Sequence, residues 1–438
     1  MSITRPKLLR SVIAASVLTT SMVHAAGFAI IENSASGMGS AFSSGGAAGE
    51  DASTVWFNPA SMTLLKGQNI VVAGHLIVPT ADFTNDGSTN ADGSALSGPD
   101  SQGGKNAFVP NLYYVGQVTD SVYLGVSLNA PFGLGTKYDD DWVGRYHAVN
   151  TELTTINFNP AIAWRINEQW SIGAGASLQY VDVTLTSAVD TGALLGSPNS
   201  ADSFASLTAD NTDSLSYGWN VGLVYEPQKS TRISLAYRSS ISHDVKGDAD
   251  FTMNSASGPI VSTGIFTDTT LYATVELPAS ASLSLFQNFS DFDLMADVTW
   301  TNWSVFEELR IKYDNPKQPD SVTTENYQDQ WRAALGGRYH LDEAIVFRAG
   351  LAYDQKAVKS AEYRTPRIPD NDRIWTSLGM GWQFSEIVGM DLGYSHLFVP
   401  DTSINNTFES SQATLAHTLK GNYDASVDIF SAQLNVKF

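Results

Sequence analysis

Short segments that alternate apolar with polar residues at period two repeat along almost the whole chain, and the joins between them are short and long in turn. The C-terminal segment shows the alternation clearly, because Phe430, Leu434 and Phe438 fall on one face and Ser431 and Asn435 on the other. Side chains on a strand point alternately to its two faces, so such a segment places hydrocarbon against lipid and polar groups in a lumen. The pattern predicts an all-β fold, an antiparallel transmembrane β-barrel.

The alternation divides the chain into fourteen predicted strands, an even number as in bacterial outer-membrane barrels. They span residues 68–79, 107–119, 122–135, 151–166, 170–185, 214–226, 231–247, 270–286, 291–306, 327–340, 344–358, 373–385, 388–399 and 421–438. The long joins at 80–106, 186–213, 248–269, 307–326 and 400–420 are predicted external loops. A soluble β-sandwich is the alternative, but it does not explain why Trp164, Trp300 and Trp382 fall near strand ends, where barrels carry aromatic girdles.

Two segments precede the predicted barrel, which we place at residues 67–438. Residues 1–25 combine a basic start, a short apolar run and a small-residue site, which predicts a secretory signal peptide and a mature chain that begins at Ala26. Residues 26–66 are rich in Gly, Ala and Ser and lack the alternation, so we expect a compact hatch inside the lumen. A disordered linker is the alternative, but apolar residues such as Val55 and Trp56 favour burial.

Composition argues against several classes of function. The formal net charge of −20 does not suit nucleic acid, and the absence of cysteine excludes disulfides and thiol catalysis. The histidines are scattered without metal-ligand spacing, so we expect no metal and no cofactor. No G-x-S-x-G or nucleotide-binding motif occurs, and we predict that the protein is not an enzyme; a lipase with a Ser/His pair assembled from different strands is the alternative.

A proline interrupts the third predicted strand. Pro131 cannot donate to a β-ladder, and Gly133 follows closely. Because a closed barrel has no edge strand, this predicts a kink with missing hydrogen bonds that opens a hole in the wall. The alternative is that the strand ends before Pro131 and the remainder is loop. A second proline, within Asn58-Pro59-Ala60, predicts a turn in the hatch.

Several charged residues within the predicted strands fall on the lumen face. They are Arg165, Asp297, Arg332, Arg348 and Asp354. We favour an ion-pair network that holds strands and hatch over direct contact with a ligand. The acidic run at residues 139–141 is interpreted as a solvated external loop; a divalent-cation bridge to lipopolysaccharide phosphates is the minor alternative.

Taken together, these residues resemble the long-chain fatty-acid outer-membrane transporter family (FadL type). The similarity extends over the whole mature chain and rests on Ala26-Gly27-Phe28, Asn58-Pro59-Ala60, Pro131-Phe132-Gly133-Leu134, Trp142-Val143-Gly144-Arg145-Tyr146, the run of residues 364–373 and the terminal Phe438. The resemblance implies a fourteen-stranded barrel with an N-terminal hatch in its lumen. It also implies that a hydrophobic ligand enters an external groove, reaches an inner pocket and leaves sideways at the kink of the third strand.

The resemblance assigns roles to individual residues. It places Phe28 in the inner pocket, Asn58, Pro59 and Ala60 on the hatch side of the gate, and Ala130, Pro131, Phe132 and Gly133 on its wall side. The two basic positions that meet the carboxylate in fatty-acid members align with Ser187 and Thr323 here. That departure favours a neutral hydrocarbon over a long-chain fatty acid, unless Arg310 or Lys312 substitutes.

We therefore expect a monomer in the bacterial outer membrane that transports hydrophobic molecules passively. Its partners would be the ligand, outer-membrane lipid and lipopolysaccharide. An apolar molecule gains about 0.8 kcal/mol per CH₂ on leaving water, which favours sideways release into lipid without an energy source. A general diffusion porin with an unplugged lumen is the main alternative, and a lipolytic enzyme is a weaker one.

Overall fold

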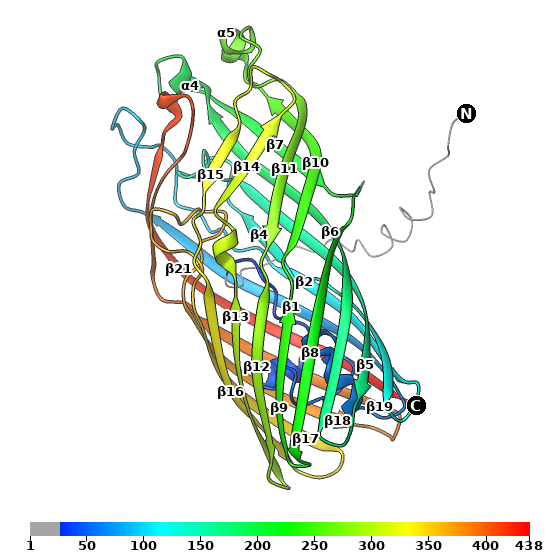
Figure 1. The fold of residues 1–438 in the computed structure, drawn as a ribbon. Helices are drawn as coiled ribbons and strands as arrows, with labels where there is room; N and C mark the ends of the chain where they lie inside the picture. The colour runs from blue at the N-terminus through cyan, green and yellow to red at the C-terminus, as the bar shows by residue number, and fades with distance from the viewer. Residues whose placement is uncertain (1–26, 213) are drawn as a thin grey trace, which may run out of the picture.

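The computed structural model describes residues 27–212 and 214–438, so the predicted signal peptide and the residue Ala26 lie outside the described residues. The described chain forms a closed antiparallel barrel of fourteen strands, as predicted (Figure 1). Round the wall, the strands follow the order β1, β2, β3, β5, β6, β8, β9, β12, β13, β16, β17, β18, β19 and β21. The barrel closes because β21 pairs with β1.

The wall strands and the segments that extend them have the following bounds. They are β1 (Gln68–Asn85), β2 (Ala107–Gln117), β3 (Val122–Asn129), β4 (Gly133–Lys137), β5 (Asn150–Arg165), β6 (Trp170–Asp190), β7 (Asp202–Asp210), β8 (Ser216–Gln228), β9 (Thr231–Arg238), β10 (Ile241–Thr252), β11 (Thr269–Leu277), β12 (Ser280–Asn288), β13 (Phe292–Thr301), β14 (Glu308–Tyr313), β15 (Ser321–Thr324), β16 (Gln330–His340), β17 (Ile345–Asp354), β18 (Arg373–Gln383), β19 (Val388–Phe398), β20 (Thr402–Thr407) and β21 (Thr418–Lys437). Short helices α4 (Thr191–Leu194), α5 (Gly258–Val261), η2 (Ser255–Ser257), η3 (Trp303–Val305) and η4 (Ala413–Leu415) lie in the connections.

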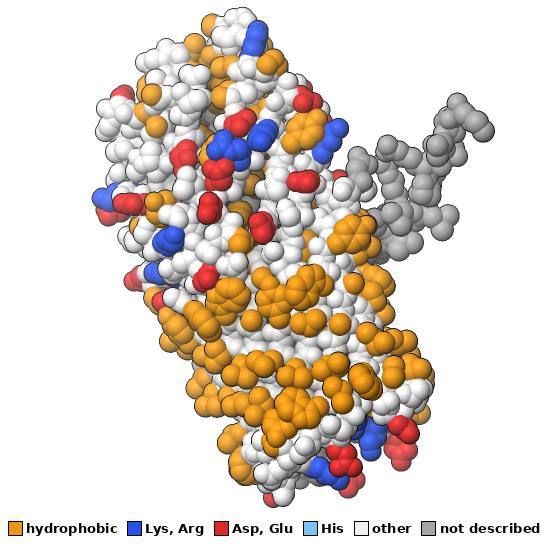
Figure 2. Space-filling model, in the orientation of Figure 1, with side chains coloured by type: hydrophobic (Ala, Val, Ile, Leu, Met, Phe, Trp, Pro, Cys, Tyr) orange, Lys and Arg blue, Asp and Glu red, His pale blue; other side chains and the backbone are white. Residues whose placement is uncertain are grey.

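The outer surface carries a belt of apolar side chains. In β16, for example, Trp331 and Leu335 are exposed while Arg332 and Ala334 on the opposite face are buried. Figure 2 shows the belt over the lower half of the wall, with charged side chains above and below it. No helix among the described residues is long and apolar enough to cross a membrane. An outward-facing apolar belt of this kind is the part of a barrel wall that faces the hydrocarbon of a membrane.

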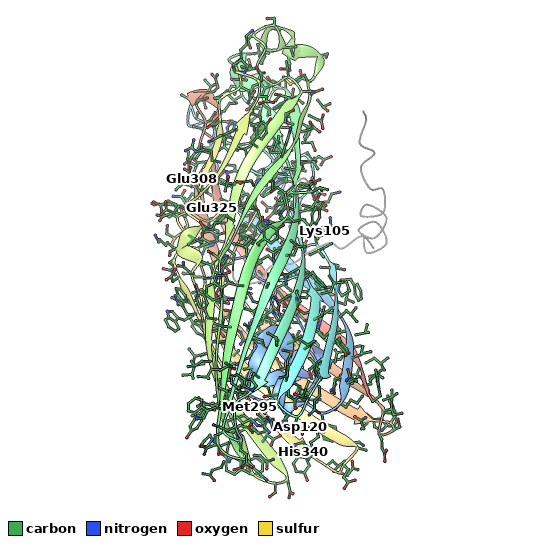
Figure 3. All side chains as sticks on the ribbon, turned by 45° about the vertical axis from the view of Figure 1, so that its right-hand side comes forward. Lys105, Asp120, Met295, Glu308, Glu325 and His340 are labelled. Atoms are coloured by element: carbon green, nitrogen blue, oxygen red, sulfur yellow. The ribbon has the colours of Figure 1, made fainter. Side chains whose placement is uncertain are left out.

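The wall continues well beyond this belt, and here the predicted loop boundaries were wrong. β6 runs on to Asp190 and β7 lies inside the predicted loop 186–213, while β14, β15 and β20 lie inside the predicted loops 307–326 and 400–420. Outside the bilayer the outer face need not be apolar, so the alternation that marks a strand disappears while the backbone ladder persists. Figure 3 places Glu308 in this extension, and Asp120 and His340 at the opposite end, where the connections are short turns.

The hatch, residues 27–66, fills the lower half of the lumen and is seen in dark blue in Figure 1. It contains α2 (Ala35–Gly39), α3 (Thr54–Phe57) and η1 (Pro59–Leu64). Its small residues allow backbone to pack against backbone: a Cβ added at Gly39 would lie 2.8 Å from the Cα of Gly379 in β18. The richness in Gly, Ala and Ser therefore reflects close packing against the wall, and the linker alternative is wrong.

An ion-pair cluster ties the hatch to the wall. Glu50 pairs with Arg348 of β17, and its second oxygen lies 2.9 Å from a nitrogen of Arg338 of β16. Arg348 also meets Asp391 at 2.9 Å and Arg338 meets Asp293 at 2.7 Å. The predicted structural role of Arg348 is confirmed.

Candidate transport path

The wall is interrupted at the position of Pro131. β3 ends at Asn129 and β4 begins at Gly133, and β4 continues the ladder with β5 but not with β2. The pairing between β2 and β3 stops at Leu112 and Leu128, so residues 107–111 of β2 have ladder partners only in β1. The predicted kink is confirmed, and because β4 resumes the strand, the alternative of an early strand end is wrong.

The N-terminal segment of the hatch takes up the hydrogen bonds that the wall lacks at the kink. The Gly133 amide donates to the Phe28 carbonyl at 2.9 Å, and the Ile30 amide donates to the Pro131 carbonyl at 2.8 Å. Ala29 and Phe132 form the antiparallel bridge between these two bonds. The kink therefore turns into the lumen and pairs with the start of the hatch, which leaves the edge of β2 without a ladder partner on that side.

Four aromatic rings close around this junction, and we call them the aromatic septum: Phe28, Phe132, Trp303 and Phe306. The Phe28 ring centroid lies 4.7 Å from that of Trp303, 5.5 Å from that of Phe306 and 6.2 Å from that of Phe132. Trp303 comes from η3, which lies between β13 and β14 and interrupts the strand at this point. Edge-to-face contacts of this kind stabilise the cluster beyond what the burial of each ring contributes.

An outer cavity of about 150 Å³ lies on the external side of the septum. Leu185 and Ile311 line it and belong to the same buried cluster as Phe28, and Leu309 lines it and packs against that cluster. Ser187 and Thr323 line it as well, so the two positions that the resemblance singled out do face a cavity. The family resemblance therefore located this cavity, although it identified no basic residue that lines it.

The predicted substitutes for the missing basic residues do not reach this cavity. Leu309, Ile311 and Tyr313 of β14 line it, so the alternating Arg310 and Lys312 point to the other face. Arg310 instead pairs with Glu308 at 2.7 Å. The expectation that Arg310 or Lys312 serves the ligand is therefore wrong.

A different cation lines the outer cavity. Arg367, from the connection between β17 and β18, donates through Nη1 to the Asn150 carbonyl at 3.3 Å and to Thr151 Oγ1 at 2.9 Å. Burial lowers the pKa of Arg367 to about 10, with Glu325 opposing part of the shift, so the guanidinium stays charged at neutral pH. Arg367 belongs to the run 364–373 that carries the family resemblance, but the resemblance assigned it no role, and its place in the cavity becomes visible only in the tertiary fold.

An inner cavity of about 190 Å³ lies on the hatch side of the septum. Pro59 of the hatch and Pro131 and Phe132 of the kink all line it, so the structure brings these predicted gate residues together. Ala130 and Gly133 are buried at the two ends of the kink. Arg332 and Asp354 line the same cavity.

Asn58 and Ala60 lie beside this cavity rather than in its lining. Asn58 Nδ2 donates to the carbonyls of Leu223 and Leu235, both at 3.2 Å, and its Oδ1 accepts from the Ala60 amide at 2.9 Å. There is room for this side chain because position 222 is glycine, where an added Cβ would lie 1.8 Å from Asn58 Oδ1. In this structure Asn58 anchors the hatch to β8 and β9.

Comparison with known proteins agrees with this architecture. Residues 16–438 match the family described as outer membrane protein transport protein (OMPP1/FadL/TodX). The long-chain fatty acid transport protein of Escherichia coli O6:H1 is 32% identical over 400 residues, covering 87% of this chain and 88% of the relative. Outer membrane protein P1 of Haemophilus influenzae is 30% identical over 465 residues, covering 97% of this chain and 99% of the relative.

Solved structures share the fold. A Pseudomonas aeruginosa FadL homologue superposes with a TM-score of 0.88 at 24% identity, covering 94% of this chain and 100% of its own. The toluene transporter TodX of P. putida gives a TM-score of 0.66 at 15% identity, covering 88% and 94%. The chain therefore belongs to the OMPP1/FadL/TodX family of bacterial outer-membrane transport proteins, which carry hydrophobic compounds and are not enzymes.

Proposed function

We propose that the protein moves hydrophobic molecules from the outer cavity past the aromatic septum into the inner cavity, and then sideways into the bilayer beside β3. The observation that carries this proposal is the unpaired edge of β2 at residues 107–111, next to a cavity lined by Pro131 and Phe132. Each CH₂ that stays out of water is worth about 0.8 kcal/mol, so transport down a concentration gradient needs no energy source. A general diffusion porin would require an open lumen, which the packed hatch does not leave.

Restoring the ladder at the kink is expected to reduce uptake several-fold while the barrel still assembles. The variant combines Pro131→Val, which supplies the missing N–H, with Gly133→Thr, which favours an extended strand. Uptake of a radiolabelled hydrophobic substrate by a transporter-deleted strain is the measurement. Pro160→Val in the neighbouring strand β5 is the matched control and should leave uptake unchanged. Wild-type uptake by the kink variant would contradict the sideways exit.

For the ligand, we propose a long-chain acid whose carboxylate meets Arg367 and whose tail lies against Leu185 and Ile311 of the outer cavity. Relatives that are 30–32% identical carry the name long-chain fatty acid transport protein, and Arg367 supplies a cation although Ser187 and Thr323 do not. The acidic groups that line the cavity have partners of their own: Asp190 accepts two backbone amides, Asp320 pairs with Arg310, and Glu409 accepts the Thr324 amide.

Arg367→Met is expected to weaken binding of a long-chain acid about tenfold, the order of a charge-assisted hydrogen bond. Binding of a neutral hydrocarbon of the same length should change little, because the apolar lining remains. Equilibrium competition between the two ligands on the purified protein measures both. Preference of the unaltered protein for the hydrocarbon would overturn the proposed acid and leave a neutral ligand.

A further inference from the structure

Arg332 is a buried arginine with unused hydrogen-bond donors. It projects from β16 into the lumen with 5% of its surface exposed, and its Nη2 donates to the Ala41 carbonyl at 2.6 Å. Its guanidinium lies 5.3 Å from the centroid of the Trp375 ring. Nε and Nη1 have no hydrogen-bond partner among the described residues. Buried donors are nearly always satisfied in folded proteins, so these two are available to an acceptor that comes from outside the chain.

The unused donors of Arg332 lie at one end of the inner cavity, and the kink at Pro131 lies at the other end. Arg332, Pro131 and Phe132 all line this cavity. The same number of strands separates β3 from β16 in the two directions round the wall: β5, β6, β8, β9, β12 and β13 one way, and β2, β1, β21, β19, β18 and β17 the other. The inner cavity therefore crosses the lumen from an apolar end at the gap to a polar end at the opposite wall.

We propose that the inner cavity is a transit site for an amphipathic molecule, in which Arg332 binds the oxygen atoms of the head group while the hydrocarbon tail lies against Pro131 and Phe132. The ligand class is a carboxylic acid with an alkyl tail. Because the tail is the end next to the gap, the molecule enters the bilayer tail first. This inference rests on the proposed sideways exit and adds a second polar site and a direction of travel to it.

The other charged groups of the cavity decide how the head group is held. Asp297 accepts from Ser284 at 2.6 Å and from Thr299 at 2.8 Å, and Asp354, the register partner of Arg332 on β17, accepts from Gln330. Arg238 donates to the Trp56 carbonyl at 2.8 Å. Two carboxyl groups and two guanidinium groups line the cavity, so binding depends on the free donors of Arg332 and is opposed by Asp354.

This opposition allows an experiment that separates a merely structural role of Arg332 from a binding role. The probe is a long-chain fatty acid with a diazirine at its terminal carbon, photolysed on the purified protein and mapped by mass spectrometry. In the unaltered protein the tail should label residues 28–33 and 130–133. Asp354→Asn, which removes a repulsive charge, should keep or increase that labelling. Arg332→Met combined with Asp354→Asn should reduce it about tenfold, although the same carboxylate has been neutralised.

The matched probe is an alkane with the same terminal diazirine, whose labelling should not differ between the single and the double variant. Equal labelling by the acid in those two variants would overturn the inference, and so would an equal loss of labelling by acid and alkane. The kink variant, Pro131→Val with Gly133→Thr, separates this inference from the proposed function. It should lose uptake while it keeps the labelling that depends on Arg332. If it keeps uptake instead, the sideways exit fails.

Discussion

A disulfide between cysteines introduced by Ala29→Cys and Phe132→Cys is expected to stop uptake, and reduction is expected to restore it. The two positions are partners in the antiparallel bridge between the hatch and the kink, a geometry within reach of a disulfide. The described chain contains no free cysteine of its own, so the introduced pair has no native competitor there. The bond would fix the N-terminal segment to the kink and hold Phe28 in the aromatic septum, between the two cavities.

The measurement is substrate uptake by cells or proteoliposomes before and after a thiol reductant. Each sample is its own control, because the reduced protein carries the same two substitutions. A second pair, Ser377→Cys with Ser395→Cys, joins register partners of β18 and β19 in the wall and should leave uptake unchanged in either redox state. Full uptake by the oxidised 29–132 protein would show that the ligand passes without displacing the N-terminal segment.

Glu50→Gln is expected to loosen the hatch in a barrel that stays folded. The substitution leaves Arg338 and Arg348 with their partners Asp293 and Asp391, but removes the charge that ties the hatch to them. Breaking a fully buried ion pair costs about 3–5 kcal/mol. The side chain of Glu50 keeps 22% of its surface exposed, so we expect a loss nearer ~2 kcal/mol in hatch stability. Hydrogen exchange of hatch amides and ion current through single channels measure this effect.

Acid should produce the same change in the unaltered protein. Burial by itself would raise the pKa of Glu50, but Arg348 and Arg338 together lower it to about 2, from an ordinary value of 4.5. A lowered pKa in the folded state means that the contribution of Glu50 is fully present above about pH 4.5 and is lost as the pH falls toward 2. The Glu50→Gln protein should lack this part of the acid response. An identical acid response in both proteins would show that another group controls the hatch.

A structural feature could be predicted from the sequence when its cause lies in the residue itself or in its neighbours along the chain. The kink at Pro131 was predictable because the missing N–H belongs to the residue itself, and the belt strands were predictable because lipid imposes the alternation. The extended wall was missed because strands outside the bilayer need no such pattern. An ion-pair network was predicted for both Arg332 and Arg348. Arg348 has one, whereas the described residues give Arg332 no ion pair and its guanidinium donates to the Ala41 carbonyl instead.

The same limit applies to the residues that face the ligand. Ser187 and Thr323 were located by resemblance, and the structure places them on β6 and β15, although both lay in predicted loops. Arg367 lies in a long connection, and although its run 364–373 was recognised as a motif, the contacts that place its side chain in the cavity come from distant parts of the chain. The roles of Asn58 and Ala60 also depend on tertiary contacts, because it is Gly222 and Gly173 on distant strands that leave room for them.

The close backbone packing of the hatch against β18 has a consequence for the cell as a whole. Backbone packed against backbone at this contact leaves no room for water between the hatch and β18, which limits the passage of salts, sugars and hydrophilic antibiotics on that side of the lumen. On the proposed sideways exit, hydrophobic solutes do not have to pass this contact. In that case the protein would admit hydrophobic molecules without opening a water-filled pore through the outer membrane.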